Sequence, residues 1–193
     1  MGSNALQKEG RYTYADYIQW PADERWEIIN GIAYMLTSPN TKHQQICVQL
    51  VVEFGAYLRG RNCQVFTSPY DVVLPDKSEN EISSSNVVQP DLLIVCDRNK
   101  LDDKKCIGAP DLVVEIISPS TAKCDMRYKY QLYERHGVRE YWIVHPDYSL
   151  IEQFANEEGN FTKIGSFSAE DEMSPHIFPD LTIKLSNIFE PKD

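Results

Sequence analysis

The sequence predicts an α/β fold, a mixed β-sheet with helices packed against it. Two apolar runs at 89–95 and 111–118, rich in β-branched residues and bounded by Pro and Ser, are typical of strands buried on both faces. An amphipathic segment at 43–60 predicts a long helix. A second helical segment ends near residue 137 and leads directly into a third apolar strand at 140–144. Strands that alternate with helices indicate an α/β protein.

Length and composition favour a single domain over residues 1–193. No run is long enough to cross a bilayer, and the N-terminus lacks the pattern of a signal peptide, so we expect no membrane association. The five cysteines are odd in number and never form a CxxC pair. This usage favours reduced thiols in the cytoplasm, with each cysteine acting as a small buried hydrophobe.

The formal net charge is −10. Proteins that bind duplex DNA tightly without a metal ion usually present a basic face. The negative net charge therefore argues against tight, metal-free binding of nucleic acid. It does not exclude a nuclease, because acidic site residues add to the count.

The N-terminal half predicts several short elements. Residues 1–11 are polar and are expected to be loose. Thr13 can cap a short helix that extends to residue 20. Asn30 and Gly31 form a two-residue turn signal between apolar arms, which predicts a hairpin. The long helix ends at Gly60, Pro69 interrupts an extended segment, and residues 76–86 are expected to be a solvated loop.

The C-terminal half continues the alternation. A charged loop at 97–105 joins the two buried strands. Ser120 or Thr121 can cap the next helix, which ends at Gly137. A turn at 145–147 precedes a hairpin over 150–167, and the tail is expected to pack on the core through Phe178, Leu181, Ile183 and Ile188.

Two acidic residues lie in or beside the buried strands. Asp91 opens the first run, and Glu115 lies inside the second. A buried carboxylate is costly unless it is paired, hydrogen-bonded or bound to a metal. If the strands are neighbours, Asp91 and Glu115 can hold Mg²⁺ or Mn²⁺ and leave positions open for a phosphate. The alternative is a surface Asp91 and a Glu115 paired with an arginine.

Three further residues have only weak local signals. Asp125, Lys129 and Tyr133 share one helix face, and the spacing alone favours an exposed Asp125–Lys129 pair. Strand alternation puts Glu27 opposite Trp26, and by itself this favours a solvent-facing carboxylate. His43 lies in the first turn of the long helix, where a capping or surface role is usual. The sequence has no GxSxG, GxxxxGK[ST], GxGxxG or HExxH motif.

The motifs taken together resemble a known family. Pro90-Asp91, DLVVEIISPST at 111–121, the Lys129-x-x-x-Tyr133 spacing and GVREYWIV at 137–144 are similar to the putative restriction endonuclease family of the PD-(D/E)xK nuclease superfamily. The segments at 12–35 and 38–44 resemble its N-terminal pattern. The resemblance covers nearly the whole chain. It implies a restriction-endonuclease-like core and Mg²⁺-dependent hydrolysis of phosphodiesters, with DNA as the substrate.

The resemblance also assigns residues. It places the two acids of the superfamily at Asp91 and Glu115, as metal ligands, and an additional N-terminal acid at Glu27. Ile117 occupies the usual lysine position, so the resemblance implies that Lys129, on the following helix, replaces that lysine. Lys123 is a weaker candidate. His43 also matches a family position, without an assigned role.

Three functional hypotheses follow. The first is a Mg²⁺- or Mn²⁺-dependent DNA endonuclease with catalytic residues Glu27, Asp91, Glu115 and Lys129. The second is a catalytically inactive, homodimeric interaction module that keeps the nuclease fold. It is motivated by the acidic charge and by Ile117. The third is a metal-dependent hydrolase of another phosphate ester. Superfamily nucleases often pair to cut two strands, so a homodimer is compatible with the first hypothesis as well.

Overall fold

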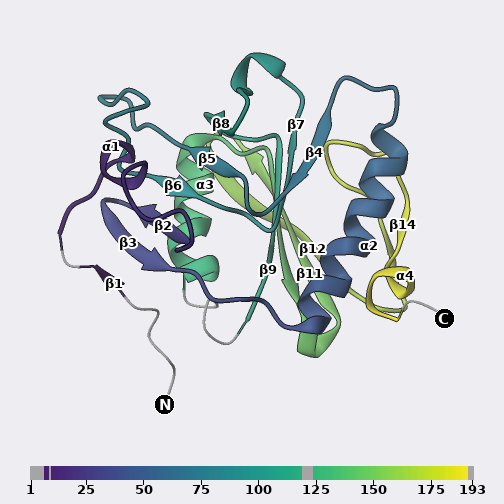
Figure 1. Cartoon of the computed structure of the whole chain (residues 1–193). Coiled ribbons are helices and arrows are strands. Elements are labelled where there is room, and N and C mark those ends of the chain that lie inside the picture. Colours follow the sequence, from purple (N-terminus) through teal and green to yellow (C-terminus); the bar gives the residue numbers. More distant parts are fainter. Residues whose placement is uncertain (1–6, 9, 119–123, 191–193) are drawn as a thin grey trace.

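The computed structural model describes residues 7–8, 10–118 and 124–190. A mixed sheet in the order β12-β11-β10-β9-β7-β4 forms its centre, with β9 parallel to β10 and the other neighbours antiparallel (Figure 1). The prediction of an α/β fold with a mixed sheet between helices is confirmed. The strands are β4 (Gln64–Thr67), β7 (Leu92–Val95), β9 (Leu112–Ile116), β10 (Glu140–His145), β11 (Leu150–Glu157) and β12 (Asn160–Ser168).

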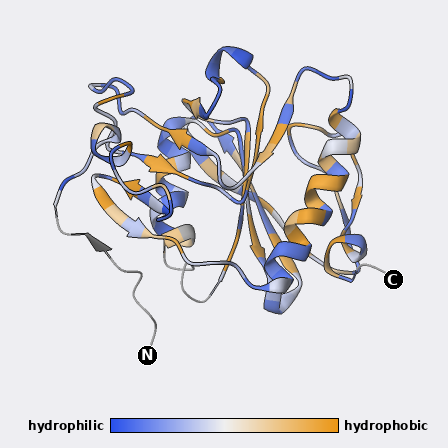
Figure 2. Cartoon of the chain, viewed as in Figure 1, coloured by the Kyte–Doolittle hydropathy of each residue, from blue (hydrophilic) through white to orange (hydrophobic). Residues whose placement is uncertain are grey.

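Helices cover both faces of this sheet. On β7, Leu92 and Ile94 pack in the core that contains α2 (Thr41–Leu58). Leu93 and Val95 pack in a second core, on the side of α3 (Tyr130–His136). Figure 2 shows that hydrophobic residues dominate the central strands, whereas the outer loops are largely hydrophilic. Burial on both faces explains the near-continuous apolar sequence of these strands.

The two long helical segments agree with the sequence pattern. The side chain of Asn40 caps α2 by accepting a hydrogen bond from the main-chain N–H of His43 at 2.9 Å. A π-helical turn, η2 (Cys124–Lys129), leads into α3, which ends at Gly137 with φ of 80°. A positive φ favours glycine, so this end of the helix was predictable. The predicted caps Ser120 and Thr121 lie outside the described residues.

A second sheet lies beside the first, in the order β1-β3-β2-β6-β5-β8. Asn30 and Gly31 join β2 to β3 with φ of 53° and 79°, which confirms the predicted hairpin turn. Gln7 and Lys8 pair with β3, so the expectation of a loose segment at 1–11 is wrong for these two residues. The strands are β1 (Gln7–Lys8), β2 (Trp26–Ile29), β3 (Ile32–Met35), β5 (Asp71–Val73), β6 (Val87–Val88) and β8 (Lys105–Ile107).

The segment 76–86 is more ordered than its polar composition indicated. Ser84 and Asn86 are fully buried. The Asn86 side chain donates to the carbonyl of Leu74 at 3.2 Å and accepts from the main-chain N–H of Asn30 at 2.9 Å. The expectation of a solvated loop is therefore wrong at these residues, because their side chains satisfy main-chain groups of the second sheet.

The C-terminal tail packs on the α2 face of the central sheet, as predicted. Leu181, Ile183 and Ile188 belong to the core on that face. Glu140 on β10 is fully buried, and its carboxylate accepts hydrogen bonds from Trp142 at 2.6 Å, from Gln153 at 2.7 Å and from the main-chain N–H of Ile177 at 2.9 Å. All three donors are neutral, and the one at Ile177 connects the tail to the sheet.

The remaining elements are short or lie at the edges. No helix within the described residues is both long enough and apolar enough to span a bilayer. The predicted hairpin over 150–167 is present as β11 and β12, and the predicted turn at 145–147 is present as a single 3-10 turn, η3. The elements are α1 (Tyr14–Tyr17), η1 (Arg98–Lys100), η3 (Pro146–Tyr148), β13 (Glu172–Met173), β14 (Ile183–Lys184) and α4 (Leu185–Phe189).

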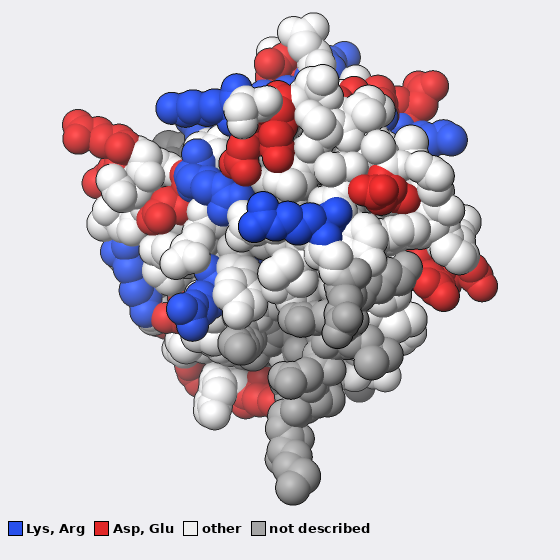
Figure 3. All heavy atoms as spheres, turned by 90° about the vertical axis from the view of Figure 1, so that its left-hand side faces the viewer, with Lys and Arg blue, Asp and Glu red and all other residues white. Residues whose placement is uncertain are grey.

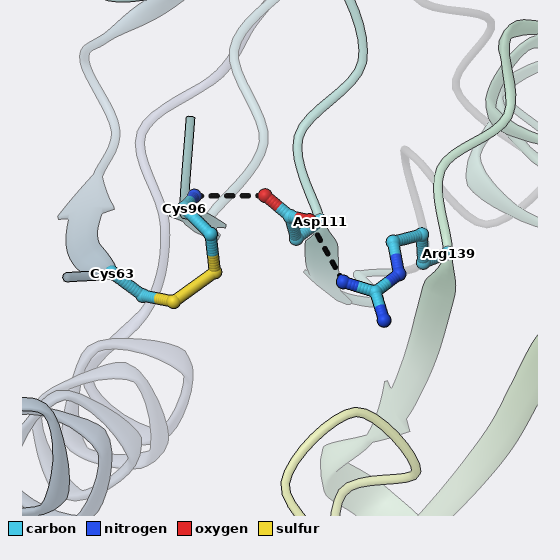
Figure 4. Close-up of a disulfide and its surroundings, with 4 residues drawn as sticks. All are labelled: Cys63, Cys96, Asp111 and Arg139. Atoms are coloured by element: carbon cyan, nitrogen blue, oxygen red, sulfur yellow. Dashed lines mark hydrogen bonds and ion pairs between the residues drawn. A yellow bond between two sulfur atoms is a disulfide. The ribbon is translucent and has the colours of Figure 1, made fainter. Parts of the chain in front are cut away.

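A disulfide joins Cys63 to Cys96 across the ends of β4 and β7 (Figure 4). The expectation of five reduced thiols is wrong for this pair, because the antiparallel register puts residues 63 and 96 opposite each other just beyond Gln64 and Val95. Asp111 accepts a hydrogen bond from the main-chain N–H of Cys96 at 2.8 Å and pairs with Arg139 at 3.1 Å. The cysteine pattern therefore no longer supports a reducing compartment.

We expect reduction of this disulfide to lower the free energy of unfolding by about 2–4 kcal/mol, because the bond closes a long loop in the unfolded chain. The two cysteines are 33 residues apart. Urea unfolding with and without dithiothreitol measures the difference, and the Cys63→Ala/Cys96→Ala variant should not respond to the reductant. Equal stability of the wild type under both conditions would contradict the prediction.

Candidate active site

The strand β9 directs Glu115 toward α3. Its neighbours Val114 and Ile116 pack in the core on the α2 side, and Val113 packs in the core on the α3 side. Alternation therefore points the Glu115 side chain to the α3 side of the sheet. The residue is 3 % exposed, so its carboxylate needs partners from that helix.

Lys129 and Tyr133 supply these partners. The Lys129 ammonium lies 3.0 Å from Glu115 Oε1, and the Tyr133 hydroxyl donates to the same oxygen at 2.7 Å. Lys129 is 3 % exposed, which overturns the interpretation of an exposed Asp125–Lys129 pair. The side chain of Asp125 and all of Lys123 lie outside the described residues. Lys129 ends the π-helical turn η2, a feature that is frequent at functional sites.

The second sheet contributes Glu27, which lies on β2. Its Oε1 atom is 2.8 Å from the Lys129 ammonium and accepts a hydrogen bond from the main-chain N–H of Gln89 at 2.7 Å. Glu27 is 1 % exposed, so the solvent-facing interpretation is wrong. One ammonium thus bridges two buried carboxylates, one from each sheet. We call Glu27, Glu115, Lys129 and Tyr133 the carboxylate–lysine cluster.

The protonation of Tyr133 follows from its burial in this cluster. Desolvation, and secondarily the charge of Glu115, raise the pKa of Tyr133 well above its usual value of 10.0. Tyr133 is therefore a neutral hydrogen-bond donor over the whole physiological range.

Asp91 lies just before β7, opposite the end of β9. Its Oδ2 atom accepts the main-chain N–H of Ile116 at 2.8 Å and lies 3.2 Å from Nε2 of His43. The surface or capping role considered for His43 does not describe this residue, which is buried and contacts Asp91. Two contacts on one oxygen fix the orientation of the carboxylate.

A cavity of about 370 Å³ brings Asp91 and the cluster together. Asp91, Glu115 and Lys129 line it, together with His43 from α2 and Arg25 from the segment before β2. The nearby thiol of Cys47 is no nucleophile at neutral pH, because burial, and secondarily Asp91, raise its pKa to about 11. The chemistry available in the cavity is therefore that of carboxylates and cations.

Sequence patterns gave no indication of two residues at this site. Arg25 lines the cavity, and its Nε–H and Nη2–H groups donate hydrogen bonds to the side-chain oxygen of Gln89. Gln89 is next to the Pro90-Asp91 pair, and this proximity is the one signal that could have drawn attention to it. Arg25 had no such signal, because its position beside Asp91 and Glu115 depends on how the second sheet packs against the central one.

The donor set fits a hard divalent cation. Asp91 and Glu115 offer carboxylate oxygens from neighbouring strands and line the same cavity. Across the described ranges, no group of three or more His, Cys, Asp or Glu side chains is arranged to hold a metal ion. Mg²⁺ does not require such a group, because it is usually bound by one or two carboxylates, with waters and phosphate oxygens as the other ligands.

A solved structure shares this architecture. The crystal structure of a putative nuclease belonging to DUF820 from Anabaena variabilis ATCC 29413 aligns with a TM-score of 0.73 at 17 % identity, over 92 % of this chain and 97 % of that one. The fold is therefore of the restriction-endonuclease-like class, as the resemblance implied.

The family follows from the sequence. Residues 14–186 match the model of the Uma2 family, described as "Putative restriction endonuclease", and the chain belongs to this family. Two proteins from Synechocystis sp. (strain PCC 6803) are similar to it. "Uncharacterized protein slr1290" is 26 % identical over 82 % of this chain and 81 % of its own length, and "Uncharacterized protein sll1609" is 22 % identical over 79 % and 81 %. The family and the solved structure together support a nuclease.

We expect Lys129→Met to lower the free energy of unfolding by about 3–5 kcal/mol, because it leaves two buried carboxylates without their shared cation. Urea unfolding measures the loss. Lys184→Met is the matched control, since Lys184 forms an exposed pair with Glu172 at 3.4 Å and should cost less than about 1 kcal/mol. Similar effects of the two substitutions would show that the cluster does not stabilise the fold.

The raised pKa of Tyr133 predicts a loss of stability in alkali. Above pH 10 the unfolded chain releases the phenolic proton while the folded chain retains it, so the free energy of unfolding falls as pH rises. Thermal unfolding between pH 8 and about pH 11 should therefore show a steeper decline for wild type than for Tyr133→Phe. Parallel curves would rule out this contribution of Tyr133.

Proposed function

We propose that this protein is a Mg²⁺- or Mn²⁺-dependent endonuclease that hydrolyses phosphodiester bonds of DNA. The observation that supports this function best is the arrangement in one cavity of Asp91, Glu115 and Lys129, with Glu27 behind the lysine. Membership of the Uma2 family and the fold shared with a nuclease agree with it.

Asp91 and Glu115 would hold the metal ion. When bound, the ion would lower the pKa of a water molecule and offset negative charge on the phosphate. His43 and the N–H of Ile116 both contact Oδ2 of Asp91, and among the described residues Oδ1 has no partner, so it is the oxygen that a metal ion would use. Tyr133 and Lys129 both contact Oε1 of Glu115 and so hold this carboxylate in place.

Lys129 would act at the reacting phosphate. Its ammonium is held by Glu27 and Glu115 at 2.8 and 3.0 Å, at the wall of the cavity. From there it can orient the attacking water and stabilise the charge that develops on the phosphate oxygens. Water would add to phosphorus as one ester bond breaks, giving a phosphate monoester and a hydroxyl group. Glu27 would position Lys129.

Metal titration and strand cleavage test this proposal together. We expect wild type to bind Mn²⁺ in calorimetry and to cut duplex DNA with Mg²⁺ or Mn²⁺. Asp91→Asn and Glu115→Gln, which keep the side-chain volumes, should weaken metal binding by about 10–100-fold. Lys129→Gln should keep metal binding and lower the cleavage rate by about 100-fold or more.

The control variant is Asp180→Asn, which removes a carboxylate from an exposed pair with Arg61. It should change neither the metal affinity nor the rate of DNA cleavage. Absence of metal binding by wild type at millimolar metal, even with DNA present, would overturn the proposal in favour of a nuclease-fold interaction module. Cleavage of small phosphodiesters without cleavage of DNA would instead indicate a hydrolase of other phosphate esters.

A further inference from the structure

A phosphodiester that enters this cavity meets acidic side chains (Asp91, Glu115 and Asp147) as well as basic ones. The net charge of the chain is −10, and on the face shown in Figure 3 basic and acidic side chains are interspersed. Lys129 is already shared by two carboxylates. The binding of a polyanion therefore depends on cations at the cavity whose charge is not yet balanced.

Arg25 is such a cation. It is half-buried and lines the cavity, and none of the residues described in the structure forms an ion pair with it. Its Nε and Nη2 atoms donate to Oε1 of Gln89 at 3.1 and 2.9 Å, and Nη2 also donates to the hydroxyl of Ser68. Both partners are neutral, so the guanidinium keeps its full charge. Lys42 also lines the cavity, but it is exposed and has no comparable tethers in the described part of the chain.

The orientation of Gln89 is itself determined. Its side-chain amide nitrogen donates to Oδ1 of Asp71 at 2.9 Å and to the hydroxyl oxygen of Tyr17 at 3.0 Å. Tyr17 donates its own proton to Asp71 at 2.8 Å, so its oxygen is an acceptor for Gln89. The amide nitrogen therefore faces two acceptors, and Oε1 has to face Arg25.

The same residue connects Arg25 to the carboxylate–lysine cluster. The main-chain N–H of Gln89 donates to Glu27 at 2.7 Å, and Glu27 pairs with Lys129. Gln89 thus holds Arg25 through its side chain and Glu27 through its main chain. The groups on Nη1 of Arg25 have no hydrogen-bond partner among the described residues and remain for a ligand.

We propose that Arg25 binds a backbone phosphate of the DNA substrate at the cavity wall, and that Gln89 is a positioning residue for Arg25. This inference rests on the proposed function, because it assumes that the cavity receives a phosphodiester. An arginine suits this role since it is always charged and presents several N–H groups in one plane to phosphate oxygens. Neutral tethers fix the side chain before binding without cancelling its charge.

DNA binding as a function of salt tests the inference. A fluorescein-labelled duplex is titrated in anisotropy measurements with Ca²⁺ in place of Mg²⁺, using wild type, Arg25→Gln, Arg25→Lys and Arg98→Gln. Loss of one phosphate contact should weaken binding about tenfold and lower the slope of log K against log salt by about 1. Arg25→Lys keeps the charge but loses the two-point contact with Gln89, so it should keep the slope and bind with intermediate affinity.

Arg98 provides the matched control. It is exposed in η1, which follows β7, whereas Asp91 precedes this strand, so Arg98→Gln removes the same charge at the end remote from the cavity. It should bind DNA like wild type. Calorimetric Mn²⁺ affinity and the unfolding midpoint should be the same for Arg25→Gln and wild type, which separates lost phosphate binding from a damaged site or fold.

The outcomes separate this inference from the proposed function. Equal affinity and equal salt slope for wild type and Arg25→Gln would overturn the role of Arg25 and leave the metal-dependent reaction untouched. Absence of duplex binding by wild type would also overturn it. Weaker binding by Arg25→Gln alone would support the inference, even if wild type proved unable to cut DNA.

Discussion

The site depends on one buried ammonium group. Lys129 contacts Glu115 from the central sheet and Glu27 from the second sheet, at 3.0 and 2.8 Å. Without it, two carboxylates would lie in a nearly water-free environment with no cation between them, which is strongly unfavourable. With it, one ion-paired group at the cavity wall connects the two sheets. Structural and proposed catalytic roles therefore coincide in the same three side chains.

Local patterns were sufficient for most elements of the fold. The hairpin at Asn30 followed from turn chemistry, and the end of α3 followed from the glycine at position 137, the residue type best suited to the positive φ found there. The buried strands followed from their continuous apolar sequences. The disulfide was missed because its two cysteines become neighbours only through the register of β4 and β7. Asn86 was missed because polar composition does not show where a side chain finds its partners.

The candidate site was less accessible to sequence reasoning. The strand pattern alone brought Asp91 and Glu115 together, since adjacency of two strands is a common outcome for consecutive apolar runs. Periodicity alone assigned Glu27 and Lys129 to exposed faces, because it identifies a face of an element but not the neighbour that covers it. Only the resemblance to a family singled them out. Neither approach singled out Arg25 and Gln89, since they come together only through the pairing of β2 with β6.

Glu140 has a consequence for how far the chain can be shortened. Its buried carboxylate takes one of its hydrogen bonds from the main chain at Ile177, and Gln153 connects the same carboxylate to the carbonyl of Ser174 at 3.0 Å. A truncation that removes Ile177 would take away a donor to this buried carboxylate and uncover the α2 face of the core. The tail is thus an integral part of the folding unit, and a fragment that ends at β12 is not a smaller version of this protein.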